Sequence, residues 1–164
     1  MRLAFLPLLL LASPAMAQSE VVRALCQKTG CDEFVVESAE RVRQNHSGIL
    51  MRTRIKTFVA SNRGRQEMGT ESGYVFCSYD RPTIIAESSG RFASVEIAPF
   101  AMLGQREQRA QTNFNAMYFA VCHGTEAGRE AVRDVASTAD ELGYRTELQK
   151  PVTRSLNSPE DVLR

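Results

Sequence analysis

The chain has 164 residues, with 20 basic and 19 acidic side chains and a formal net charge of +1. Proteins that bind nucleic acids, or membranes by charge, usually carry a clear excess of bases, so this balance favours neither class. The length is that of one domain with a single hydrophobic core.

Residues 1–17 have the pattern of a cleaved signal peptide. Arg2 is a positive charge at the start, residues 3–12 form an apolar run, and Ala15-Met16-Ala17 is a small-x-small cleavage site. The run is shorter than the roughly 20 residues that span a bilayer. We expect a periplasmic or secreted protein without a membrane span after cleavage. Its formal charge is zero once Arg2 is removed.

Four cysteines, an even number in an exported chain, predict two disulfides. Of the three possible pairings, we favour Cys26–Cys31 as a local link, because four residues separate its members, and Cys77–Cys122 as a long bridge. The spacing matches neither zinc nor haem motifs, and the chain has two histidines. We therefore expect no metal site and no cofactor.

The first elements are predicted to be a helix and a strand. Ser19 can cap a short helix that runs to Leu25, with Gly30 near its end. Residues 34–42 are typical of a strand, and residues 44–48 have the composition of a hairpin turn.

Residues 49–59 show the clearest alternation in the chain. Ile49, Met51 and Ile55 fall on one face of the predicted strand, while Arg52, Arg54 and Lys56 fall on the other. Residues 61–72 are polar and indicate either a mobile binding loop or the tip of a hairpin.

Residues 73–79 have the strongest strand composition and are predicted to be the central strand, ended by Asp80-Arg81-Pro82. Residues 83–87 and 91–97 are predicted to pair as a tight hairpin. Two helices are expected next, over residues 105–122 and 125–142, and residues 144–148 are a candidate edge strand.

These elements predict an α+β domain. An antiparallel sheet of about five strands is followed by two C-terminal helices packed on one face, with one helix tethered by Cys77–Cys122. We expect a single globular domain over residues 18–152 and a flexible tail over residues 153–164.

No catalytic residue is assigned. Cys122 beside His123 would be bonded to another cysteine and unable to attack a substrate. Ser78 lacks the flanking glycines of a hydrolase nucleophile elbow. Glu67 and Glu71 lie in a polar segment where acids are usually solvated.

The most specific surface feature is a set of five bases: Arg52, Arg54, Lys56, Arg63 and Arg65. They are either a solvated strand face paired with Glu37 and Glu40, or a docking surface for an anionic partner, such as an acidic protein patch or an envelope polymer.

Small size, charge balance and disulfides favour a non-enzymatic exported binding protein, of an inhibitor or immunity type, in a bacterial periplasm. Its expected partner is another protein or an anionic envelope component. The alternatives are an accessory subunit of an envelope assembly or secretion complex, and a small hydrolase. For the hydrolase, His46 or His123 would have to meet an acid and a hydroxyl.

Overall fold

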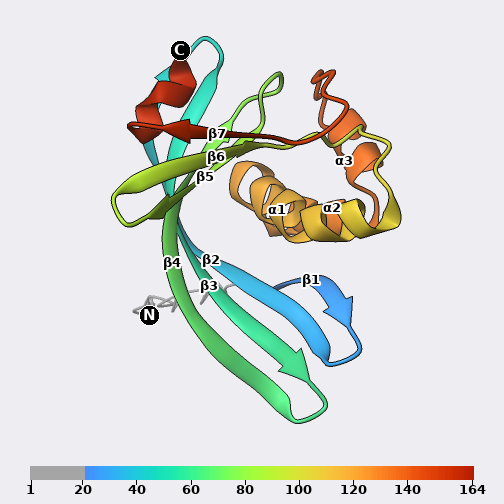
Figure 1. Ribbon diagram of the computed structural model, residues 1–164. Coiled ribbons are helices and arrows are strands. Elements are labelled where there is room, and N and C mark those ends of the chain that lie inside the picture. Colours follow the sequence, from blue (N-terminus) through green and yellow to red (C-terminus); the bar gives the residue numbers. More distant parts are fainter. Residues whose placement is uncertain (1–20) are drawn as a thin grey trace, which may run out of the picture.

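A computed structural model describes residues 21–164. Within them, seven strands form one antiparallel sheet in which the strand order follows the chain (Figure 1). Three α-helices lie between the sixth and seventh strands, and a 3-10 helix follows the seventh. The α+β class is confirmed, but the sheet has seven strands and not five. The predicted signal peptide lies outside the described residues.

The elements follow one another as a meander interrupted once by helices. The strands are β1 (Val22–Gln27), β2 (Gly30–Asn45), β3 (Gly48–Ser61), β4 (Gly64–Cys77), β5 (Thr83–Ser88), β6 (Arg91–Glu96) and β7 (Val152–Leu156). The helices are α1 (Gln105–His123), α2 (Thr125–Arg133), α3 (Val135–Glu141) and the 3-10 helix η1 (Pro159–Leu163).

The long strands β2, β3 and β4 are the frame of the molecule. As predicted, the side chains of β3 alternate: Thr53 and Ile55 are buried, whereas Arg52 and Arg54 are exposed on the opposite face. Only four residues of β4, beginning at Gly73, pair with β5, so the sheet divides into two arms (Figure 1). The upper arm contains β5, β6 and β7. The lower arm contains β1 and the facing ends of β2, β3 and β4, and it ends in the β1–β2 and β3–β4 turns.

The α-helices lie between the two arms (Figure 1). Helix α1 contacts β1, β2, β4 and β5, and it buries Tyr118 and Phe119 against Val75 and Ile84. The second expected helix is divided into α2 and α3. Asp134 has extended backbone angles at the break, and its carboxylate accepts a hydrogen bond from Ser137 N (3.0 Å), as an N-cap does.

Two segments near the start of the domain differ from the prediction. Residues 22–27 form strand β1 and not a helix, because Cys26 pairs directly opposite Cys31 and β1 thereby completes a hairpin with β2. The polar residues 61–72 are the tip of the β3–β4 hairpin and most of β4, so the hairpin interpretation is the one that the structure supports.

Residues 153–164, for which a flexible tail was expected, contain most of β7 and all of η1. Val162 of η1 is 4% exposed and packs with Leu50 and Phe76 on the face of the sheet opposite the α-helices. The Asn45 side chain donates a hydrogen bond to Leu163 O (2.9 Å). Residues 144–148 are not a strand. Strand β7 forms the edge of the sheet next to β6, and β1 forms the other edge.

Both predicted disulfides are present. Cys26–Cys31 closes the β1–β2 hairpin, and Cys77–Cys122 joins β4 to α1. Among residues 21–164, no helix combines the length and the apolar character needed to cross a membrane.

Candidate functional site

His123, the residue beside Cys122, takes part in a buried hydrogen-bond chain. Its Nε2 lies 2.6 Å from Tyr144 Oη, which lies 3.1 Å from Tyr118 Oη. Tyr118 Oη in turn donates to Ser78 O and accepts from Ser78 N, both at 3.0 Å. Since Tyr118 is 0% exposed, this chain satisfies polar groups that would otherwise be costly to bury.

One arrangement of protons satisfies every link of this chain. The Tyr118 proton goes to Ser78 O and the Tyr144 proton goes to Tyr118, so His123 Nε2 must carry the hydrogen donated to Tyr144. Burial lowers the pKa of His123 and raises the pKa values of Tyr118 and Tyr144. All three groups are therefore neutral near pH 7, as expected for a structural network.

The other candidate catalytic groups are also accounted for by the fold. Ser78 is 4% exposed, and its Oγ accepts a hydrogen bond from Arg81 N (3.2 Å). Glu67 pairs in register with Phe58, and Glu71 pairs with Ile55, which places the two acids on opposite faces of the sheet. They cannot act as a pair on one substrate.

The two histidines have different surroundings and are not close in sequence. His46 is exposed in the β2–β3 turn, whereas His123 contacts Tyr79, Phe119 and Tyr144. Neither lines any of the clefts described below. Within residues 21–164, no three His, Cys, Asp or Glu side chains are grouped so that they could hold a metal ion.

The five bases chosen from the sequence do not form one site. Arg52 and Arg54 line a small cleft with Glu40, and Lys56 lines another with Glu37 and Arg65. Arg54 is 3.5 Å from Glu37, and Lys56 is 2.8 Å from Glu67, an ion pair that raises the Lys56 pKa. Acids therefore pair with Arg54 and Lys56, but Lys56 meets Glu67 and not Glu37 or Glu40, and Arg52 has no ion pair among residues 21–164.

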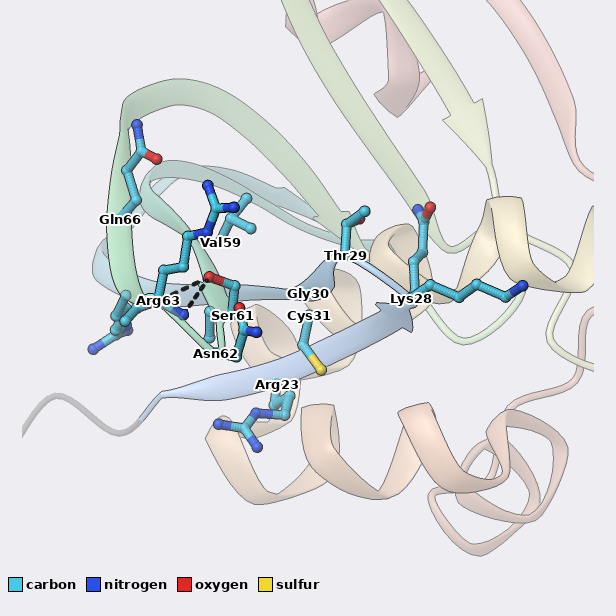
Figure 2. A pocket seen from close by; sticks show the side chains of 14 residues that line it. Arg23, Lys28, Thr29, Gly30, Cys31, Val59, Ser61, Asn62, Arg63 and Gln66 are labelled. Carbon is cyan, nitrogen blue, oxygen red and sulfur yellow. Dashed lines mark hydrogen bonds between the residues drawn. The ribbon is translucent and has the colours of Figure 1, made fainter.

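Arg63 and Arg65 lie instead at the tip of the lower arm, in the largest of these clefts. This tip cleft, with a volume of about 900 Å³, lies between the β1–β2 and β3–β4 turns (Figure 2). Its basic side chains are Arg23, Lys28, Arg63 and Arg65.

A buried acid fixes two of these arginines. The Glu33 side chain is 5% exposed and makes ion pairs with both Arg23 (2.8 Å) and Arg65 (2.9 Å). The Arg65 guanidinium also stacks on Phe58, with its central carbon 3.6 Å from the ring centroid. Glu33 itself does not line the cleft, so it orients the two arginines without placing a carboxylate there.

A second cleft lies on the other side of the same hairpin. This helix cleft, of about 860 Å³, is bounded by the hairpin and by the start of α1, from which Arg106 and Arg109 enter it. Gln27, Lys28 and Thr29 line both clefts, so the stapled turn is their shared wall. Figure 2 shows that Lys28 and Arg63 point in different directions from the tip.

Four bases around the two clefts have no ion-pair partner among residues 21–164: Lys28, Arg63, Arg106 and Arg109. No described Asp or Glu lines either cleft. These unpaired charges make the surroundings of the two clefts electropositive.

Sequence reasoning missed Arg23, Lys28, Arg106 and Arg109. The spacing of Arg106 and Arg109 gave a signal, since residues three apart share a helix face. Lys28 gave no such signal, because residues 22–25 were expected to be helical and the turn that contains Lys28 was expected to be the end of that helix.

Neither a family model, nor a curated protein, nor a solved structure matches this chain.

Proposed function

We propose that this is an exported, non-enzymatic binding protein that recognises an anionic partner at the tip of its lower arm. The observation that carries the proposal is the group of four unpaired bases around two clefts that no described acid lines. Acids oriented away from a site and bases oriented into it favour an anion over a neutral or cationic ligand.

The surroundings of the site support binding more than catalysis. Of the groups weighed as catalytic, His123, Ser78 and Glu67 make contacts within the fold, and Glu71 lies on the opposite face of the sheet from Glu67. The local disulfide and the Glu33 ion pairs hold the tip in one shape, which reduces the entropy lost on binding. An inhibitor or an immunity-type protein would use such a rigid surface against an acidic patch of another protein, and an envelope-binding protein would use it against an anionic polymer.

The compartment that we propose is the periplasm or the extracellular space. The pattern of residues 1–17 is that of an export signal, and all the cysteines of the chain are joined in disulfides, as oxidising compartments favour. Membership of a larger envelope assembly is the alternative, and it would use the same surface for a subunit contact.

The test removes three of the unpaired bases together. Lys28→Ser/Arg63→Ser/Arg109→Ser is compared with Lys150→Ser/Arg91→Ser/Arg52→Ser, which removes the same charges at exposed positions outside both clefts. Binding of dextran sulfate is measured by calorimetry at several salt concentrations, with uncharged dextran as the blank.

We expect wild-type affinity to fall as salt rises. The cleft variant should lose at least about tenfold in affinity and the control less than about twofold, since one exposed charged contact is worth a few-fold. Equal losses in the two variants, or no binding by the wild type at low salt, would overturn the proposed function.

A further inference from the structure

The two clefts are parts of one elongated surface. They share the turn residues Gln27, Lys28 and Thr29, and together they run from the β3–β4 tip across the stapled hairpin to the first turns of α1. Figure 2 shows the tip-cleft side of this surface, with Lys28 extending away from Arg63. A ligand long enough to occupy both clefts would pass over Lys28.

The bases are distributed along this surface and not gathered at one point. Arg63 and Arg65 lie at one end, Lys28 lies in the middle, and Arg106 and Arg109 lie at the other end. A small anion would contact one cleft only. Charges spread over two clefts match a chain that carries acid groups at intervals along its length.

The remaining side chains of the surface are mostly amides and hydroxyls. Gln27, Thr29, Ser61, Asn62, Gln66 and Gln105 line one or both clefts. Such groups hydrogen-bond to hydroxyl groups of a ligand as well as to its acids.

Apolar anchors are scarce there. Leu25 and Val59 are the largest apolar side chains that line the clefts, and the ring of Phe58 is covered by Arg65. Interfaces with folded proteins usually depend on buried aromatic or aliphatic anchors at their centre. The surface therefore suits a hydrated, hydroxyl-rich polymer better than a protein patch.

The shared wall is held firmly in place. Asn113 of α1 accepts a hydrogen bond from Leu25 N (3.0 Å) and donates one to the Asp32 carboxylate (2.8 Å), so it links the helix to both strands of the hairpin. Gly30 lies so close to β3 that a Cβ at this position would be 2.7 Å from Ala60 O. The two clefts are thus fixed relative to each other.

We propose that the ligand is a linear acidic polysaccharide that occupies both clefts at once and crosses the stapled turn at Lys28. This inference rests on the proposed function and specifies its partner. Its arginine contacts would be to the acid groups of the polymer, and the amides and hydroxyls would contact its sugar hydroxyls.

The experiment titrates the full mature protein with galacturonate oligomers of increasing length, from the monomer to the polymer, at one low salt concentration. Affinity per chain should rise with length and then level off once both clefts are filled. Lys28→Ser should remove most of this gain. Arg63→Ser and Arg109→Ser, one in each cleft, should each weaken the long oligomers about fivefold.

Two matched controls separate the polymer from simpler explanations. Lys150→Ser and Arg91→Ser should leave the dependence on length unchanged, because neither residue lines a cleft. Poly-L-glutamate with a similar number of carboxylates should bind more weakly, since it lacks the hydroxyls.

Affinity that does not rise with oligomer length would overturn the single elongated site. Poly-L-glutamate binding as tightly as the galacturonate polymer would instead identify an acidic peptide and overturn the polysaccharide. In either case, salt-dependent binding of dextran sulfate would leave the proposed anion-binding function standing, so the two failures are distinguishable.

Discussion

The two disulfides of this protein lie in regions that differ in whether their polar side chains have partners. Cys77–Cys122 joins α1 to β4 beside a buried chain in which Tyr118, Tyr144 and His123 satisfy one another. Cys26–Cys31 closes an exposed hairpin around which several bases have no partner among the described residues.

The difference shows where stability and recognition are separated. In the core, a polar group without a partner costs about 1–3 kcal/mol. The Tyr118 and Tyr144 hydroxyls of the buried hydrogen-bond chain accordingly both have partners. At the tip, water solvates an unpaired charge at little cost, and the charge stays available for a ligand. We therefore expect changes in the core to alter unfolding, and changes at the tip to alter binding.

The largest effect should come from removing the long disulfide. Cys77→Ala/Cys122→Ala frees a connection between residues 45 positions apart, which should lower the free energy of unfolding by about 4 kcal/mol. Cys26→Ala/Cys31→Ala frees a separation of only five and should cost about 2 kcal/mol. Urea denaturation of both variants measures the difference, and a larger loss at the tip would contradict it.

The Tyr118 hydroxyl should contribute the next largest effect. In Tyr118→Phe, Ser78 N and Ser78 O lose their shared partner in a buried position, which should cost about 2 kcal/mol in urea denaturation. Tyr79→Phe is the control, because Tyr79 is 53% exposed, and we expect it to cost less than about 0.5 kcal/mol. Similar losses in the two variants would show that the buried chain adds nothing.

Asn113 tests how the tip is coupled to the core. Asn113→Ala removes both hydrogen bonds from α1 to the hairpin and should lower the free energy of unfolding by about 1 kcal/mol. Amide exchange at Leu25 should accelerate more than exchange in β4. Thr112→Ala, which loses only a bond to Gln108 O of its own helix, should leave exchange at Leu25 unchanged.

The smallest effect should be a dependence on pH. Burial lowers the pKa of His123 below its usual value of about 6.5, so the unfolded chain binds more protons than the folded protein just below that pH. The contribution of His123 to stability is therefore present above about pH 6.5 and is lost as the pH falls towards the lowered pKa. His123→Gln should make the free energy of unfolding less dependent on pH in this window. An unchanged dependence would show that other groups cause it.

Local patterns were enough to predict much of the fold. The alternation in β3, the β5–β6 hairpin, helix α1 and both cysteine pairings follow from side-chain period, turn residues and spacing within short stretches. The segments that differ are those whose conformation depends on a distant neighbour. Strand β1 needs β2 and α1, and η1 needs Leu50 and Phe76 to cover.

The site shows the same division. Arg63 and Arg65 could be chosen from the sequence because they belong to one polar stretch. The sequence could not show that they lie beside Lys28, which is 35 or more positions earlier. It also could not show that Arg106 and Arg109 lie across the hairpin.

By itself, the sequence determined a disulfide-linked α+β domain with a helix tethered to the middle of a sheet, because period and spacing are properties of the chain. Tertiary structure alone decided which charges are paired and which remain open. Whether a base meets an acid depends on strand register and helix placement, and these follow from packing over the whole domain.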